Sequence, residues 1–329
     1  MSNRAAAAAN RMPLRTRVFT TVLDRFARKS IVDMDLEDIR RSRDSVTPAV
    51  PPFTWVTGPV FEDVTRENTS FPARDGHQVP LRVYRPPGSR EPLPVVVYLH
   101  GGGWVLGSTR SYDPLCTFLA RAVHAVVVSV DYRMAPEHRA PIAAHDCVDS
   151  VRWLAEHADS VGGNASHLAV SGDSAGGNLA AVVCQVVRDE GGPTISHQAL
   201  LYPATDATKS QPSIVEHAGG PILTLAKIDA FLELYLGPDG LATTDPLVSP
   251  LWAASHADLP PALVQTADLD PLRDEGRLYA ERLEAGGVPV RHTNYAGAPH
   301  GFASFPGATT IGKQHRAELA TELRRHLHP

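Results

Sequence analysis

The sequence predicts an α/β fold in which a mostly parallel central sheet is covered by helices on both faces. Short apolar runs typical of buried strands alternate along the chain with longer segments of helical period, as they do in successive βαβ units. Strands that read as continuous apolar runs are typical of parallel sheets buried on both faces. The 329 residues, 43% of them hydrophobic, suit one large domain with a sizeable core.

The predicted elements begin with an amino-terminal segment, residues 1–50, which carries two short helices over 14–29 and 34–44. Their apolar residues recur near the helical period. Early strands are expected at 60–64 and 79–84, and the alternation follows. Its strands are expected at 95–99, 125–130, 168–171, 198–202, 262–266 and 290–295, and its helices at 112–122, 142–157, 175–190, 273–285 and 311–327.

One stretch interrupts this alternation, between the strands at 198–202 and 262–266. It contains turn residues at 218–221 and a helical pattern over 225–236. An inserted segment of this kind, at about 206–246, is a natural lid over a site at the edge of the sheet.

Ser174 stands in the heptapeptide Gly-Asp-Ser-Ala-Gly-Gly-Asn at 172–178, directly behind a strand-like run. A serine on a sharp turn between a strand and a helix is the pattern of a nucleophile elbow. Such a turn holds the hydroxyl clear of its own chain, where a base can deprotonate it. Gly172 and Gly176 flank the serine where strand and helix crowd together and leave no space for a Cβ. Alone, the Gly-x-Ser-x-Gly pentapeptide is only moderately specific.

A second turn, His-Gly-Gly-Gly-Trp at 100–104, follows the strand pattern at 95–99. Consecutive glycines expose backbone N–H groups, which can stabilise the oxyanion that forms when an ester carbonyl becomes tetrahedral. Three glycines by themselves read as a flexible loop. Their position after a strand and ahead of a serine elbow favours an oxyanion hole instead, with the amides of Gly102, Gly103 and Ala175 as donors.

A base and an orienting acid are expected after the serine, in the order Ser, Asp or Glu, His. Asp270 follows a predicted strand, and His300 lies in a loop after the last one. Other acidic residues are alternatives to Asp270 as the acid that orients the histidine. Asp268 is close by, while Asp274 and Glu275 fit the simpler role of acids that complement a helix dipole. With 15 histidines in the chain, His300 is favoured by its order and location.

These motifs resemble those of the hormone-sensitive-lipase family of α/β-hydrolase carboxylesterases, the bacterial family IV type. The matching segments are 100–104, 131–137, 172–177, and 270–275 together with 300–302. The resemblance covers roughly residues 75 to 325. It implies an α/β-hydrolase fold with a helical cap.

By this resemblance Ser174 is the nucleophile, His300 is the general base and then the general acid, and Asp270 orients the imidazole. The oxyanion donors named above are also those of the family. His100 is implied to be structural. The segment 131–137 is implied to be a scaffold element whose charged residues brace the oxyanion loop, and the methionine at position 134, where leucine is usual, is a volume-conserving exchange.

The resemblance also implies that residues 1–50 and the insertion at 206–246 form the cap over Ser174, with 51–329 as the catalytic domain. The alternative is that both are ordinary surface helices. For Trp104, beside the oxyanion glycines, packing is an equal alternative to a place in the site. Side chains expected in the pocket wall are those of Phe26, Trp104, Leu225, Phe231 and Leu232.

The composition of the chain indicates which binding partners and which cellular location to expect. A net charge of -5 with scattered Lys and Arg residues offers no basic stripe for nucleic acid. Cys116, Cys147 and Cys184 lack metal-type spacing and are expected to be buried thiols. No apolar run reaches membrane length and no signal-peptide core is evident, so we expect a cytoplasmic protein without an integral membrane segment. A homo-oligomer is compatible with the sequence.

The function predicted is therefore hydrolysis of short- to medium-chain acyl esters, with a small-molecule ester as substrate and with no metal or cofactor. An amide or arylacetamide hydrolase would use the same residues and remains an alternative. The plant gibberellin receptors of this family bind a ligand without hydrolysis and have lost the catalytic histidine. Because His300 is present here, an enzyme is favoured over a receptor.

Overall fold

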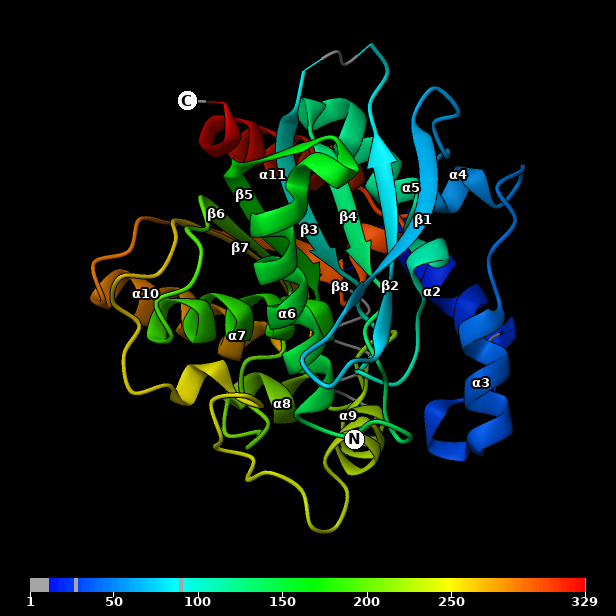
Figure 1. The fold of residues 1–329 in the computed structure, drawn as a ribbon. Coiled ribbons are helices and arrows are strands. Elements are labelled where there is room, and N and C mark those ends of the chain that lie inside the picture. The colour runs from blue at the N-terminus through cyan, green and yellow to red at the C-terminus, as the bar shows by residue number, and fades with distance from the viewer. Residues whose placement is uncertain (1–11, 27–28, 89–90, 329) are drawn as a thin grey trace.

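The computed structural model describes residues 12–26, 29–88 and 91–328, apart from the side chains of Asp24 and Phe26. At its centre is an eight-stranded sheet with the strand order β1-β2-β4-β3-β5-β6-β7-β8. The β1–β2 and β2–β4 pairs are antiparallel, and the other pairs are parallel. Figure 1 shows helices on both faces of this twisted sheet. The mostly parallel α/β architecture is confirmed.

The strands and helices have the following bounds. The strands are β1 (Thr65–Pro72), β2 (Gln78–Arg85), β3 (Leu93–Leu99), β4 (Val126–Val130), β5 (Gly163–Asp173), β6 (His197–Leu201), β7 (Ala262–Leu269) and β8 (Val290–Pro299). The α-helices are α2 (Leu14–Phe26), α3 (Leu36–Asp44), α4 (Thr54–Thr57), α5 (Asp113–Leu119), α6 (Ile142–His157), α7 (Ala175–Asp189), α8 (Pro212–Glu216), α9 (Leu225–Leu236), α10 (Arg273–Ala285) and α11 (Gly312–Leu327). Short 3-10 turns include η1 (Ile31–Asp33) and η6 (Phe302–Ser304), and a π-helical turn, η3 (Ala120–His124), extends α5.

Two apolar cores lie on opposite faces of the sheet, because successive strand residues point to opposite sides. From β3, Val95, Val97 and Leu99 join the core formed with α6, α7 and α10. The intervening Val96 and Tyr98 join the core formed with α5 and α11. All side chains of β3 are buried because helices cover both faces of the sheet at this strand.

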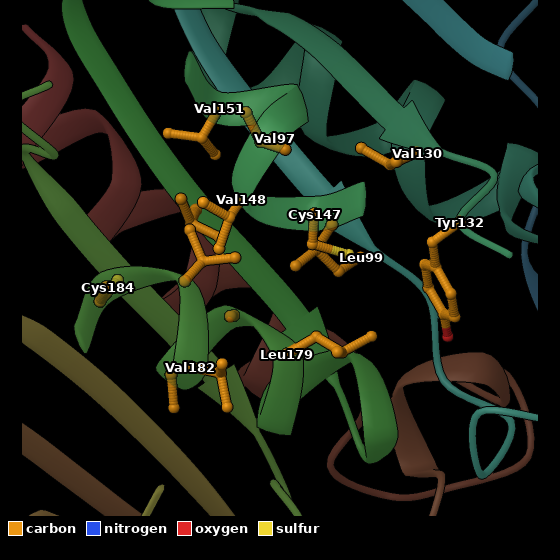
Figure 2. Packing of buried hydrophobic residues seen from close by; sticks show 14 of the residues in the cluster. Val97, Leu99, Val130, Tyr132, Cys147, Val148, Val151, Leu179, Val182 and Cys184 are labelled. Atoms are coloured by element: carbon orange, nitrogen blue, oxygen red, sulfur yellow. The ribbon is translucent and has the colours of Figure 1, made fainter. Parts of the chain in front are cut away.

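The three cysteines are buried free thiols, as predicted. Cys147 of α6 and Cys184 of α7 lie in the first core, which Figure 2 shows, and Cys116 of α5 lies in the second. Burial raises the pKa of each thiol above its ordinary value.

The strand expected at 60–64 is wrong. The first strand is β1 (Thr65–Pro72), which pairs in register with β2 from Thr65 opposite Arg85 to Pro72 opposite Gln78. It is an edge strand with mostly exposed, polar residues, so it lacks the apolar pattern by which buried strands are identified. The apolar residue Val64 is buried from the turn that precedes the strand.

The two predicted amino-terminal helices are present with shorter bounds. The described part of the first is α2 (Leu14–Phe26), and the short turn η1 lies further along the chain. The second, α3, begins after Asp35, whose side chain accepts from the Asp38 amide while the Asp38 side chain accepts from the Asp35 amide. This reciprocal capping sets the start of the helix. Both helices lie on one flank of the sheet in Figure 1, coloured blue.

Candidate active site

Ser174 occupies a sharp turn between β5 and α7, with φ 55° and ψ −119°. A non-glycine residue in this region is strained, and its amide is anchored by donation to the carbonyl of Leu201 at 2.8 Å. The flanking glycines are required by contact. A Cβ on Gly172 would lie 2.2 Å from the carbonyl oxygen of Gly176, and one on Gly176 would lie 2.0 Å from that of Leu99. The close packing inferred from the sequence is confirmed.

The side chains of Ser174, His300 and Asp270 form a hydrogen-bonded row. The distance from Ser174 Oγ to His300 Nε2 is 2.9 Å, and His300 Nδ1 lies 2.7 Å from Asp270 Oδ2. Asp270 is fully buried, and its second oxygen accepts from the Leu272 amide at 3.0 Å. Ser174, Asp270 and His300 directly follow β5, β7 and β8. These strands are parallel, so their carboxyl ends lie at the same edge of the sheet. The fold therefore brings together residues that are 126 positions apart.

The competing acids have other partners. Asp268 accepts a hydrogen bond from the Gly297 amide at 3.0 Å. Asp274 forms an ion pair with Arg273 at 2.9 Å and accepts from the Ser213 amide. Hence only Asp270, among the described acids of this segment, bonds to the ring of His300.

The glycine-rich loop after β3 lies close to Ser174, since Gly102, Gly103 and Ser174 line one cavity. Gly102 and Gly103 have φ of 129° and 62°, and a Cβ on Gly102 would lie 2.1 Å from the Leu106 carbonyl oxygen. Within the described chain, the amide N–H groups of Gly102, Gly103 and Ala175 donate to no protein acceptor. Three free donors beside a serine can stabilise a developing oxyanion.

Asp173, whose role the sequence did not reveal, joins the elbow to this loop. Its nearly buried carboxylate accepts from the Gly101 amide at 2.9 Å and from the hydroxyls of Tyr98, Tyr112 and Tyr202 at 2.9, 3.0 and 3.3 Å. Burial raises the pKa of this carboxyl above its usual value, although the donors oppose the shift. The only signal in the sequence was its position next to Ser174.

The neighbouring segment 131–137 contacts the loop directly through a backbone amide, and its charged residue Glu137 contacts the loop only through Arg43. The Ala135 amide donates to the Trp104 carbonyl at 3.0 Å, and Arg43 of α3 donates to the carbonyls of Val105 and Ala135 at 2.7 and 2.5 Å. Arg43 also pairs with Glu137 at 3.1 Å. The amino-terminal helix α3 is therefore bonded to the glycine-rich loop.

His100 is fully buried against the ring of Tyr132 and does not line the cavity described next. Its Nδ1 lies 2.9 Å from the Gly101 carbonyl oxygen. Burial lowers the pKa of this imidazole. These contacts agree with a structural histidine.

A cavity of about 380 Å³ opens over Ser174 and His300. Of the side chains expected in its wall, those of Trp104, Phe231 and Leu232 line it. The side chain of Phe26 lies outside the described residues. Leu225 does not line the cavity. It stands at the first turn of α9 and packs against the small cluster of Ile214, Leu223, Ile228 and Leu272, whose side chains themselves line the cavity.

Helix α9 covers the glycine-rich loop through two aromatic contacts. The ring of Phe231 packs directly on Gly103. A Cβ added to Gly103 would lie only 2.3 Å from the Cδ1 atom of Phe231. Trp104 stacks on Tyr235 with ring centroids 4.4 Å apart. Trp104 thus both packs and lines the site.

Much of the cavity wall was missed by sequence reasoning. These residues come from separate segments and share no local pattern: Ile31, Met34, Leu106, Tyr112, Ile214, Leu223, Ile228, Val248, Leu272 and Phe305. Among the described residues there is no group of three or more His, Cys, Asp or Glu side chains placed to hold a metal ion. No described helix is long and apolar enough to cross a membrane.

Comparison with known proteins places these features in a wider group. Residues 96–304 match the family model described as the alpha/beta hydrolase fold. The carboxylesterase NlhH of Mycobacterium tuberculosis is 46% identical over 254 residues, 76% of this chain and 79% of the relative. The ethyl acetate hydrolase of Pseudomonas putida is 36% identical over 279 residues, 83% and 86% of the two chains. A solved thermostable esterase from Pseudomonas putida has a TM-score of 0.86 and 33% identity, covering 96% and 98%.

Proposed function

This chain is a carboxylic ester hydrolase of the hormone-sensitive-lipase branch of the α/β-hydrolase family, and we propose that Ser174, His300 and Asp270 are its catalytic triad. The observation that carries the proposal is the row of hydrogen bonds of 2.9 and 2.7 Å beside an open cavity. With Nδ1–H directed at Asp270, the Nε2 of His300 is free to accept the serine proton.

In the proposed reaction Ser174 Oγ attacks the ester carbonyl while His300 Nε2 takes its proton. The amides of Gly102, Gly103 and Ala175 stabilise the negative charge on the former carbonyl oxygen. His300 then protonates the leaving alcohol, and the acyl group remains on Ser174. A water molecule, deprotonated by the same imidazole, releases the acid and restores the serine.

The proposed substrates are short- to medium-chain acyl esters. A cavity of about 380 Å³ lined largely by apolar side chains accommodates a small ester. The relative named for ethyl acetate hydrolysis supports the short end of the range.

The proposed cap consists of residues 1–50 and 206–246, over a catalytic domain of 51–329. In its support, α9 packs against η1, and both contribute to the cavity wall. Helix α2 packs Phe19 against Phe305, with ring centroids 5.0 Å apart, close to the loop of His300. If deleting residues 1–40 left a folded chain with unchanged acyl preference, this cap would be refuted.

The deciding experiment is hydrolysis of p-nitrophenyl esters from acetate to palmitate by the native chain and by Ser174→Ala at neutral pH. We expect turnover to be highest with short chains and to be lost in the variant. Turnover that survives in Ser174→Ala would overturn the triad. A p-nitroanilide of the same acyl group separates the two activities, because amide hydrolysis that matches ester hydrolysis would contradict a carboxylesterase.

A further inference from the structure

A buried arginine in α11, Arg316, has no acidic partner. Arg316 is 7% exposed, yet it forms no ion pair with any residue that the structure describes. The well-covered arginines Arg82, Arg133 and Arg273, by contrast, each pair with an aspartate at 2.6 to 2.9 Å. An uncompensated buried charge is costly, so Arg316 calls for a counter-charge.

The hydrogen bonds of Arg316 are also incomplete. Nη2 donates to the Thr57 carbonyl at 3.3 Å, and Nε has no partner. The guanidinium lies over the ring of Phe118, with Cζ 5.1 Å from the centroid. Burial lowers the pKa of Arg316 to about 10, which still leaves it charged near neutrality. An arginine has five N–H donors, so most of its capacity is unused.

Arg316 lines a second cavity, of about 170 Å³, beside the active site. Tyr112, Ser304 and Phe305 line both cavities, so the two cavities adjoin. The guanidinium of Arg316 also packs closely on Gly58, which has φ +84°. A Cβ added to Gly58 would lie 3.0 Å from Nη1 of Arg316. Ser174 and His300 line only the first cavity, whereas Arg316 lines only the second.

The rest of the lining defines the ligand. Arg316 is the sole charged side chain among the described residues of this wall, so a single negative charge balances it. Pro114, Leu115 and Phe305 supply apolar surface, and the exposed residues Thr47 and Ser111 lie at the rim. One cation beside apolar surface fits an anion with an apolar tail better than a multiply charged inorganic ion.

We propose that this second cavity binds a monocarboxylate with a short apolar tail, whose carboxylate pairs with Arg316 and whose tail contacts Pro114, Leu115 and Phe305. The site lies outside the proposed triad and oxyanion hole, so it does not depend on the proposed mechanism. Ordered water around a solvated guanidinium is the competing account, and it predicts no saturable, carboxylate-specific binding.

The test is calorimetric titration of sodium butyrate into the native chain, with sodium chloride exchanged to hold the ionic strength constant. We expect saturable binding, weakened at least tenfold in Arg316→Met. The matched control is Arg121→Met, because Arg121 also lies over an aromatic ring, Phe61, but is exposed. Butyrate bound in the catalytic cavity would be common to all three proteins. Equal binding in all three, or none in the native chain, would overturn the proposal.

A second variant and a second ligand test the same cavity independently of Arg316→Met. Thr47→Trp is designed to obstruct the rim from an exposed loop position while leaving Arg316 in place, and we expect it to weaken butyrate binding as well. This variant decides the question if Arg316→Met does not fold. Butanol has the same tail without the charge. If butanol bound with the same dependence on Arg316, the carboxylate assignment would be wrong.

Discussion

The carboxylate of Asp173 accepts a hydrogen bond from the amide of Gly101 at 2.9 Å. This contact ties the turn that carries Ser174 to the loop that carries the free amides. The distance between the proposed nucleophile and the proposed oxyanion donors is therefore expected to depend on Asp173, which this arrangement assigns the role of a positioning residue.

Asp173→Asn is expected to lower kcat about 10- to 100-fold with a smaller change in KM. An amide offers one acceptor oxygen where four donors converge, and its NH₂ group would face some of them. Tyr98→Phe is the matched control, since it removes one donor and keeps the ring; we expect a loss of less than tenfold. Equal kcat values for Asp173→Asn and the native protein would show that the loop is held by other contacts.

Arg43→Met is expected to lower the free energy of unfolding by about 2 to 4 kcal/mol and to reduce kcat. The substitution leaves the partly buried carbonyls of Val105 and Ala135 without their donor. Arg40→Met is the control, because Arg40 is exposed and, among the residues that the structure describes, bonds only to Glu137. Urea denaturation measures both variants, and similar losses would refute the special role of Arg43.

Phe231→Ala is expected to favour longer acyl chains, because it removes a ring from the cavity wall next to Gly103. We expect the ratio of kcat/KM for octanoate over acetate esters to rise about tenfold. Leu225→Ala, on the same helix but outside the cavity, is expected to change the ratio less than twofold. A larger change at Leu225 than at Phe231 would mean that the cavity wall is assigned incorrectly.

Glu275→Gln is expected to become more stable relative to the native chain as pH rises. Burial and the nearby charge of Asp206 raise the pKa of Glu275, so the folded chain holds a proton that the unfolded chain releases above about pH 4.5. The contribution of Glu275 to native stability is then greatest below that pH and falls as pH rises toward the folded pKa, by up to about 1.4 kcal/mol per pH unit. Glutamine removes this term and keeps an acceptor for the amides of Thr205 and Asp206.

The free energy of unfolding of Glu275→Gln, measured by denaturation between pH 5 and 8, tests this expectation. Glu281→Gln removes an exposed carboxylate from the same helix and serves as the control. Parallel pH curves for the native chain and Glu275→Gln would indicate that Glu275 is ionised in the folded state.

Local sequence was sufficient for the elements with their own pattern. The buried strands, the serine elbow and the glycine-rich loop each depend on neighbouring residues, and all of them are present. The first strand was missed because its order comes from pairing with β2 and its exposed residues carry no apolar period. Leu225 was expected in the cavity from its helix alone, although which face of a helix meets a cavity depends on the packing around it.

The sequence by itself determined the chemistry available to this protein: a serine on a strand-to-helix turn, an acid and a histidine after it in order, and glycines that leave amides exposed. Only the tertiary structure decided that Asp270 rather than Asp268 meets His300, that Asp173 holds the loop, and that Arg316 faces a cavity without a carboxylate. The physical reason is that these relationships are distances between segments far apart in the chain. Packing brings such segments together, and no local pattern records it.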